Sequence, residues 1–170
     1  MVHKTEAGAV VLNLKDEGSL SLAAAKMKRD VTAYDVRAVS NLFLVEAMSP
    51  KPLAELIINI RQDPQFGAAL VLGSGGILVE LLADTVTLLL PTRPVEIIRA
   101  LKSLRVGPLL EGFRGRPAVD IPKVAAEIYK LCITYQEHIK TTAEIEINPL
   151  FVYQEKVFAI DALIQVPADK

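Results

Sequence analysis

The sequence has few features that would suit a membrane, an oxidising compartment or a polyanion. Its single cysteine, Cys132, cannot form an internal disulfide, and its apolar setting is typical of a small core residue in a reducing cytoplasm. Apolar runs reach only about eight residues, too short to span a bilayer, and no signal peptide precedes Val2. We therefore expect a cytoplasmic protein with no membrane-spanning segment.

The sequence also lacks a dominant charge. The formal net charge is −1, from 19 Lys and Arg against 20 Asp and Glu. The largest basic cluster is Lys26, Lys28 and Arg29, which is too small to form the broad positive surface that nucleic acids require. One small phosphate ligand remains compatible with this balance. Hydrophobic residues make up 51% of the 170 residues, enough for a sizeable buried core.

The most informative stretch lies near the end of the chain. Glu144, Glu146 and Asn148 alternate with Ile145 and Ile147. In a β-strand, side chains two residues apart share a face, so the three polar groups would lie on one side and the isoleucines on the other. The pattern predicts a strand with one face suited to chemistry.

A hairpin is expected to bring Asp161 to the same place. Residues 151–153 and 157–163 are strand-like, and the polar residues 154–156 between them can turn the chain. Pairing across this turn would set Asp161 near Asn148. Carboxylate and amide oxygens suit Mg²⁺, which keeps several waters and is commonly shared with phosphates. The alternative is a polar strand face that binds nothing.

The remaining pattern predicts an α+β fold with a mixed or mainly antiparallel sheet and helices packed on it. Ser19, Thr92 and Asp120 are candidate helix caps. Helices are expected at residues 19–29, 93–104 and 121–138, and strands at residues 9–14, 43–48, 54–61, 68–72, 77–82 and 85–90. Glycine and proline signals separate these segments.

Several further residues have both a functional and a structural interpretation. The small residues 73–76, which include Gly75 and Gly76, could let backbone N–H groups approach an anion or could form a tight turn. Arg114 could grip a phosphate or cap a carbonyl. Glu46 and Glu55 are carboxylates in apolar segments, where ribose hydroxyls, a lysine or an edge position would compensate their desolvation.

Taken in order, these motifs form a series that extends over nearly the whole chain, from His3 to about Val166. The matching blocks are HKTEAG at 3–8, LVE at 44–46, ELI at 55–57, RQDPQFG at 61–67, GSGGILVE at 73–80, LEGFRG at 110–115, and EINPL at 146–150 with Asp161. The series resembles the ATP-grasp part of NDP-forming acyl-CoA synthetases, including the β portion of ADP-forming acetyl-CoA synthetase. A more distant resemblance is to the β subunit of succinyl-CoA synthetase.

This resemblance implies a reaction and a set of residue roles. Acyl-CoA, ADP and phosphate would interconvert with a carboxylate, CoA and ATP through an acyl phosphate and a phosphohistidine. Asn148 and Asp161 would be Mg²⁺ ligands, and Glu146 would steady the phosphohistidine, while Glu144 would face solvent. The positions that match the nucleotide-binding part of the family are Lys4, Gly8, Glu46 and Glu55, to which Gly75, Gly76 and Arg114 add candidate phosphate contacts.

The same resemblance implies that parts of the enzyme lie outside this chain. The strand lysine that binds nucleotide phosphates in the family has no counterpart here, and neither His3 nor His138 is a candidate for the phosphorylated histidine. We therefore expect a partial ATP-grasp domain over residues 1–170, of which residues 1–14 are a remnant of the preceding lobe. The departures also include Asn59 where glycine is usual, Ser74 where leucine is usual, and Ala9 where a second glycine is common.

Because the ATP-grasp domain is expected to be partial, we expect this chain to be inactive alone. It would work with a CoA-binding domain or subunit that carries the phosphohistidine. Sheet edges left by a missing lobe would also favour homo-oligomers. One alternative is a non-catalytic, acyl-CoA-synthetase-like regulatory region of a protein acetyltransferase. Another is an assembly module whose acidic strand binds nothing.

Overall fold

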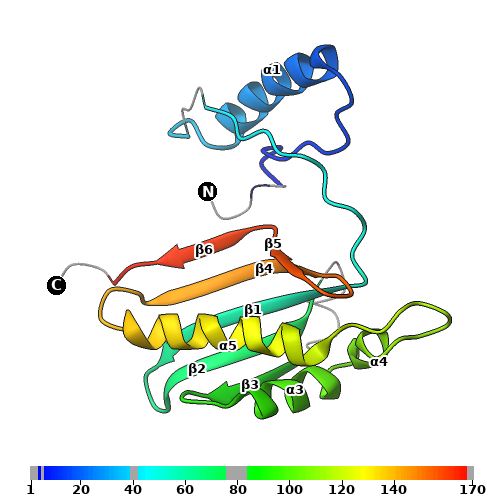
Figure 1. Ribbon diagram of the computed structural model, residues 1–170. Coiled ribbons are helices and arrows are strands. Elements are labelled where there is room, and N and C mark those ends of the chain that lie inside the picture. Colours follow the sequence, from blue (N-terminus) through cyan, green and yellow to red (C-terminus); the bar gives the residue numbers. More distant parts are fainter. Residues whose placement is uncertain (1–3, 5, 39–41, 76–83, 168–170) are drawn as a thin grey trace. The chain divides into compact units, whose positions relative to one another are not determined.

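The computed structural model describes residue 4 and residues 6–38, 42–75 and 84–167, which form two compact units, residues 1–50 and residues 51–170 (Figure 1). The predicted strand at 77–82 and Gly76 lie outside the described residues. Within the described ranges, no helix has the length and apolar character needed to cross a membrane.

The first unit contains one long helix, α1 (Glu17–Tyr34). Its N-cap is Asp16, whose side chain accepts a hydrogen bond from the Ser19 N–H at 2.7 Å, while the Ser19 hydroxyl oxygen accepts one from the Asp16 N–H at 3.2 Å. This reciprocal capping box satisfies two donors at the helix start. The prediction of Ser19 as the cap was therefore wrong by three residues.

Two predicted strands of the first unit are extended segments without strand pairing. Residues 9–14 and 43–48 form no ladder with any described residue, and Leu12 and Leu44 are 61% and 85% exposed. A strand requires a hydrogen-bonded neighbour, which local β-propensity does not supply. The prediction of strands at these two places is corrected accordingly.

The second unit is built on an antiparallel sheet, as predicted. Strand order is β3-β2-β1-β4-β5, and β6 also pairs with β4 (Figure 1). The strands are β1 (Ala54–Asp63), β2 (Gly67–Ser74), β3 (Thr85–Leu89), β4 (Glu144–Val152), β5 (Val157–Ala159) and β6 (Ala162–Gln165). The α+β fold class is thus confirmed, including the predicted hairpin of β1 and β2.

Helices α3 (Pro94–Ser103) and α5 (Ile121–Glu137) lie together on one face of this sheet, with the short α4 (Gly107–Leu110) beside them (Figure 1). Residues of α5 at helical spacing, such as Val124, Ile128 and Tyr135, join alternate residues of the strands in one buried core. Cys132 is 1% exposed within this core, which agrees with its predicted packing role.

The helix caps of the second unit were predicted in part. The Asp120 side chain accepts a hydrogen bond from the Lys123 N–H at 3.0 Å and caps α5, as expected. Helix α3 begins after Arg93 instead of Thr92, because Glu96 reaches back to accept the Arg93 N–H at 2.8 Å. The Thr92 hydroxyl donates to the same Glu96 carboxylate at 3.1 Å.

A bulge interrupts β4 between Ile147 and Leu150, next to the predicted metal ligand Asn148. Ile58 of β1 pairs with Ile147, but Leu56 pairs with Leu150, so β4 advances three residues where β1 advances two. One extra residue in a strand turns the following side chains to the opposite face. The buried positions of β4 accordingly change from Ile145 and Ile147 to Leu150 and Val152. Asn148 and Pro149 lie at this change.

Candidate functional site

The sheet face opposite α3 and α5 carries the polar side chains. We call it the open face, and its central residues are Glu55, Ile57 and Asn59 of β1 with Glu144 and Glu146 of β4. All five are half-buried and alternate with the fully or nearly buried residues of the helix-covered face. The predicted alternation of the EIEIN stretch is therefore confirmed.

Asn148 and Asp161 come together as the hairpin predicted. The Asn148 N–H donates to the Asp161 carbonyl at 3.2 Å. The flanking pairs Ile147–Ala162 and Leu150–Ala159 keep one register, which sets Asn148 directly opposite Asp161. Side chains of directly opposed residues share a face and lie within reach of each other. Both residues are exposed; Asn148 lies within β4, and Asp161 lies at the junction where β5 ends and β6 begins.

The chemistry of this pair fits the Mg²⁺ site that the sequence predicted. An amide oxygen and a carboxylate at a strand bulge are hard oxygen donors, and Mg²⁺ commonly takes one or two such protein ligands and completes its shell with waters and phosphates. Among the described residues, no three His, Cys, Asp or Glu side chains are grouped closely enough to form an all-protein metal site. The pair therefore suits an ion that is shared with a ligand.

The two glutamates of β4 differ in their partners. Glu146 makes no hydrogen bond or ion pair with a described residue, whereas both oxygens of Glu144 accept hydrogen bonds. Asn59 Nδ2 donates to Glu144 Oε1 at 2.5 Å, and Gln165 Nε2 donates to Glu144 Oε2 at 2.8 Å. Glu144, which was expected to face solvent, lies half-buried on the open face, and neighbouring strands supply it with two amide donors that the sequence did not predict.

Asn59 was noted in the sequence only as a departure from glycine, and its contact with Glu144 was missed. Its polar side chain inside an apolar strand was the available signal, since a buried amide needs partners. Its Oδ1 atom is buried and has no hydrogen-bond partner in the part of the chain that the structure describes. The Asn59 amide is thus only partly satisfied on the open face.

Gly75 is required by close backbone packing. A Cβ atom at this position would lie 2.7 Å from the Glu55 carbonyl carbon and 2.9 Å from the Leu56 nitrogen. The Gly75 N–H also donates to the Glu55 carbonyl at 2.7 Å. This N–H is therefore engaged within the sheet, which favours the tight-turn interpretation at Gly75. Glu55 keeps a half-buried carboxylate with no bonded partner among the described residues.

Arg114 lies in an exposed turn between two glycines. Its φ is 50°, and Gly112 and Gly115 on either side also have positive φ values of 94° and 81°. The guanidinium carbon lies 5.2 Å from the centroid of the Phe113 ring, and Arg114 donates to no carbonyl within the described ranges. Its predicted phosphate contact stays a prediction.

Lys4, Gly8 and Glu46 belong to the first unit, which we describe by itself. The Ala9 N–H donates to the Lys4 carbonyl at 2.8 Å and closes a turn in which Gly8 has φ of 67°. A Cβ atom on Gly8 would lie 3.0 Å from the Asp30 Cβ of α1, so close approach also favours glycine here. Lys4 and Glu46 are exposed. The predicted contacts of Lys4, Gly8 and Glu46 with a nucleotide stay predictions.

His138 lies at the end of a helix, where it has a structural role. His138 follows α5 as its C-cap, and its Nδ1 lies 2.9 Å from the Thr134 carbonyl oxygen. A histidine at a helix C-terminus complements the helix dipole and the free carbonyls there. This agrees with the expectation that His138 is structural, while His3 lies outside the described residues.

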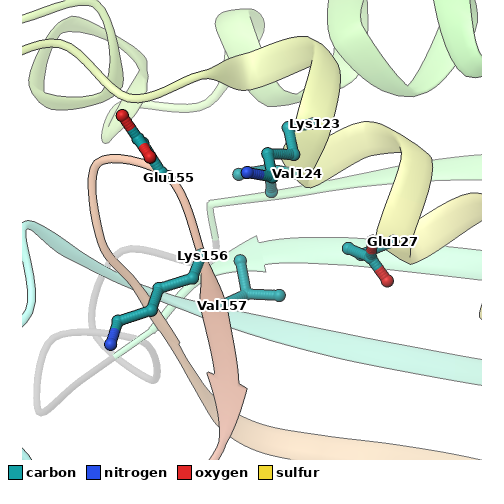
Figure 2. Close-up of a pocket in the computed structure, with 6 residues that line it drawn as sticks. All are labelled: Lys123, Val124, Glu127, Glu155, Lys156 and Val157. Atoms are coloured by element: carbon teal, nitrogen blue, oxygen red, sulfur yellow. The ribbon is translucent and has the colours of Figure 1, made fainter.

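A shallow pocket between the start of α5 and the β4–β5 turn contains none of the predicted site residues. Figure 2 shows Lys123, Val124 and Glu127 on one side and Glu155, Lys156 and Val157 on the other. The Lys156 side chain points away from Val124, and its Nζ lies 5.0 Å from the Phe158 ring centroid. Two cations and two carboxylates leave this pocket without a dominant charge.

Comparison with known proteins identifies the family. The family model described as "ATP-grasp domain" matches residues 1–166. A trans-feruloyl-CoA synthase from an unknown prokaryotic organism is 35% identical over 96% of this chain and 23% of its own length. The β subunit of the acetate–CoA ligase [ADP-forming] I of Pyrococcus furiosus is 32% identical over 95% of this chain and 69% of its own length.

A solved structure supports the same assignment. The dinucleotide-forming acetyl-coenzyme A synthetase 1 of Ca. Korarchaeum cryptofilum has a TM-score of 0.80 and 28% identity, over 97% of this chain and 71% of that chain. That structure is described as a complex with coenzyme A and Mg-AMPPCP, with its phosphohistidine segment pointing towards the nucleotide-binding site. The present chain belongs to the ATP-grasp family, among relatives that include the β subunits of ADP-forming acetate–CoA ligases.

Proposed function

We propose that this chain is the nucleotide- and Mg²⁺-binding ATP-grasp portion of an ADP-forming acyl-CoA synthetase. The reaction is acyl-CoA, ADP and phosphate interconverting with a carboxylate, CoA and ATP through a phosphohistidine. The observation that carries the proposal is the placement of Asn148 of β4 opposite Asp161. The same strand also presents the carboxylate of Glu146, which has no bonded partner among the described residues.

Asn148 and Asp161 would hold the metal ion from the bulge of β4 and the β5–β6 junction. When bound there, Mg²⁺ would neutralise phosphate charge during phosphoryl transfer. The side chains orient the ligand from a rigid sheet, because the backbone of Asn148 is itself bonded to that of Asp161. Positioning and charge neutralisation account for most catalysis of phosphoryl transfer.

Glu146 would accept a hydrogen bond from the ring N–H of a histidine presented by another domain or subunit. This contact fixes the ring orientation and stabilises positive charge on the imidazole. Its carboxylate suits the role because it is half-buried on the open face and has no competing partner in the described part of the chain. Glu146 is the catalytic carboxylate in this proposal.

The candidate nucleotide contacts follow from the family resemblance and are proposed for each unit by itself. Glu55 offers a carboxylate to ribose hydroxyls from β1, and Glu46 offers a second one from the first unit. Lys4 and Gly8 would cover the phosphates, and Arg114 would neutralise them. Gly75 would keep the chain close enough to β1 for a ligand to approach Glu55, and Gly76 stays a candidate phosphate contact outside the described residues.

The partner in this proposal is a CoA-binding domain or subunit that carries the phosphorylated histidine. The matched β subunit supports it, as does the phosphohistidine segment in the related acetyl-coenzyme A synthetase. His138 is engaged at a helix end and is unsuited to the task. This chain spans about a quarter of the trans-feruloyl-CoA synthase and about two thirds of the β subunit, and it would be inactive alone.

The test measures histidine phosphorylation in the complete enzyme, assembled with its CoA-binding partner. γ-Labelled ATP and Mg²⁺ should give an acid-labile phosphoenzyme. Asn148→Ala and Asp161→Asn should each slow its formation roughly 100-fold, the typical loss on removing one charge-stabilising group. Glu127→Gln on α5 is the matched control and should react as the wild type does. A wild-type rate in Asp161→Asn, or no Mg²⁺ dependence, would overturn the proposal.

A further inference from the structure

Three side chains from three adjacent strands form one hydrogen-bonded group centred on Glu144. Asn59 comes from β1, Glu144 from β4 and Gln165 from β6. The two amides donate to different oxygens of the carboxylate, at 2.5 Å and 2.8 Å. We call this group the amide clamp. Residues 59 and 144 are 85 positions apart in the sequence, so the contact depends on the assembled sheet.

The bond to Glu144 determines how the Asn59 amide is oriented. With Nδ2 directed at the carboxylate, Oδ1 is left buried with no partner among the described residues. The reversed amide would set one oxygen against another beside a carboxylate, which is electrostatically unfavourable. The unpartnered Oδ1 shows that satisfying Glu144 dominates the local arrangement, because a buried acceptor without a donor is itself costly.

Neutral amides, not a cation, hold this carboxylate. Arg61 is the register partner of Glu144 in β1, but it is exposed and forms no ion pair with Glu144. Beneath the clamp, the Tyr135 hydroxyl donates to the Ala143 carbonyl at 3.0 Å. The clamp therefore fixes Glu144 through hydrogen bonds and leaves its negative charge unneutralised.

This geometry keeps the two glutamates of β4 separate. Glu144 and Glu146 share the open face two residues apart, and Asn59 lies directly opposite Glu146 in the β1–β4 register. Both Glu144 oxygens are bonded across the strands, towards β1 and β6, and the Asn59 Nδ2 is directed at Glu144 instead of at Glu146, the residue directly opposite it. Within the part of the chain that the structure describes, Glu146 has no bonded partner, so its carboxylate is available to a ligand.

We propose that the amide clamp is a positioning device, in which Asn59, Glu144 and Gln165 keep the Glu146 carboxylate free and directed at the phosphorylated histidine of the partner. Glu144 and Asn59 are thus positioning residues that act through Glu146. The inference rests on the proposed function, because only that function gives Glu146 a phosphorylated histidine to contact. It adds a role for Asn59, one of the residues that depart from the family pattern.

The test uses Asn59→Asp, Glu144→Gln and the combined N59D/E144Q in the complete enzyme with its partner. In Asn59→Asp, two carboxylates face each other, so the clamp breaks. Glu144→Gln alone is mild, because the Asn59 amide can reverse and accept from the new amide. In the double variant the donor and acceptor exchange places while Gln165 still has an acceptor, so the clamp re-forms.

The rate of phosphohistidine formation at saturating Mg·ATP should fall at least tenfold in Asn59→Asp, with the KM for ATP unchanged within about twofold. The double variant should recover to within threefold of the wild-type rate. A wild-type rate in Asn59→Asp, no recovery in the double variant, or a loss confined to KM would overturn the clamp.

Unfolding by urea identifies a merely structural effect. Such an effect would lower the urea midpoint of unfolding of Asn59→Asp and leave the rate of phosphohistidine formation by the folded enzyme normal. If wild-type enzyme forms no phosphohistidine, the proposed function fails first, and the inference fails with it.

Discussion

The two faces of the central sheet differ in what their side chains contact. On the helix-covered face, Leu56, Ile58 and Ile60 are fully buried against α3 and α5. One residue along the same strand, Glu55 and Asn59 present polar groups to the open face. Hydrophobic burial drives folding, whereas half-buried polar groups are retained at a cost in stability when a site needs them. Alternate residues of β1 and β4 therefore pack the core on one face and carry polar groups on the other.

The largest expected effect tests the helix-covered face. Ile58→Ala removes a side chain that is 0% exposed, and it should lower the free energy of unfolding by about 2–5 kcal/mol through lost burial and a new cavity. Ile57→Ala, one residue away on the open face, is the matched control. Its loss should be smaller, because Ile57 is only half-buried. Urea denaturation followed by circular dichroism measures both, and equal losses would remove the distinction between the faces.

The next effect tests the open face. Glu146→Gln should slow phosphohistidine formation in the complete enzyme roughly 100-fold, because the charge beside the docked histidine is lost. The free energy of unfolding should change by no more than about 0.5 kcal/mol, as is usual for a substitution that breaks no contact. Rapid-quench kinetics and denaturation on the same preparation give the two numbers. A stability loss as large as that of Ile58→Ala would show that Glu146 belongs to the structural face.

A further effect comes from alkaline pH and concerns two buried residues of α5, which packs on the helix-covered face. Burial raises the pKa of the Cys132 thiol from 9.0 to about 12, and burial, followed by the charge of Glu144, raises the pKa of the Tyr135 phenol. Both groups therefore stay protonated longer in the folded protein, so unfolding releases protons. The stabilising contribution of the thiol is complete below pH 9 and is lost as the pH rises towards 12, and that of the phenol is lost above its ordinary pKa of 10.0.

The stability of the protein should accordingly fall above pH 9 by up to about 1.4 kcal/mol per pH unit for the thiol. Cys132→Ala should flatten this slope, and Tyr135→Phe should remove the smaller phenol contribution. Unfolding free energies measured between pH 8 and pH 11, at about half-unit steps, follow the linkage. An unchanged slope in Cys132→Ala would mean that the thiol titrates equally in both states.

Local sequence signals predicted the parts of the fold that depend on neighbours in the chain. The Asp120 cap and the apolar spacing of α5 defined that helix, and the turn at residues 63–67 defined the β1–β2 hairpin. The alternation of Glu146 with its neighbouring isoleucines predicted which residues of β4 face the core. These signals act over a few residues, so a single sequence contains them.

Contacts between distant segments were not predicted. The Asn59–Glu144 bond depends on the register of β1 against β4, which no local pattern specifies. The bulge at Asn148 likewise appears only when two strands are aligned. Residues 9–14 and 43–48 have the composition of strands, but composition does not provide the neighbouring strand that a ladder requires. Tertiary pairing therefore decided each of these outcomes.

In the proposed function, the open face holds a divalent ion between Asn148 and Asp161 when nucleotide is bound. Anomalous diffraction from crystals of the complete enzyme, soaked with Mn²⁺ and a non-hydrolysable ATP analogue, tests it most directly. We expect one anomalous peak within about 2.5 Å of oxygen atoms from both side chains, shared with the phosphates. An ordered nucleotide with no peak there, or with the ion bound at other residues, would contradict it.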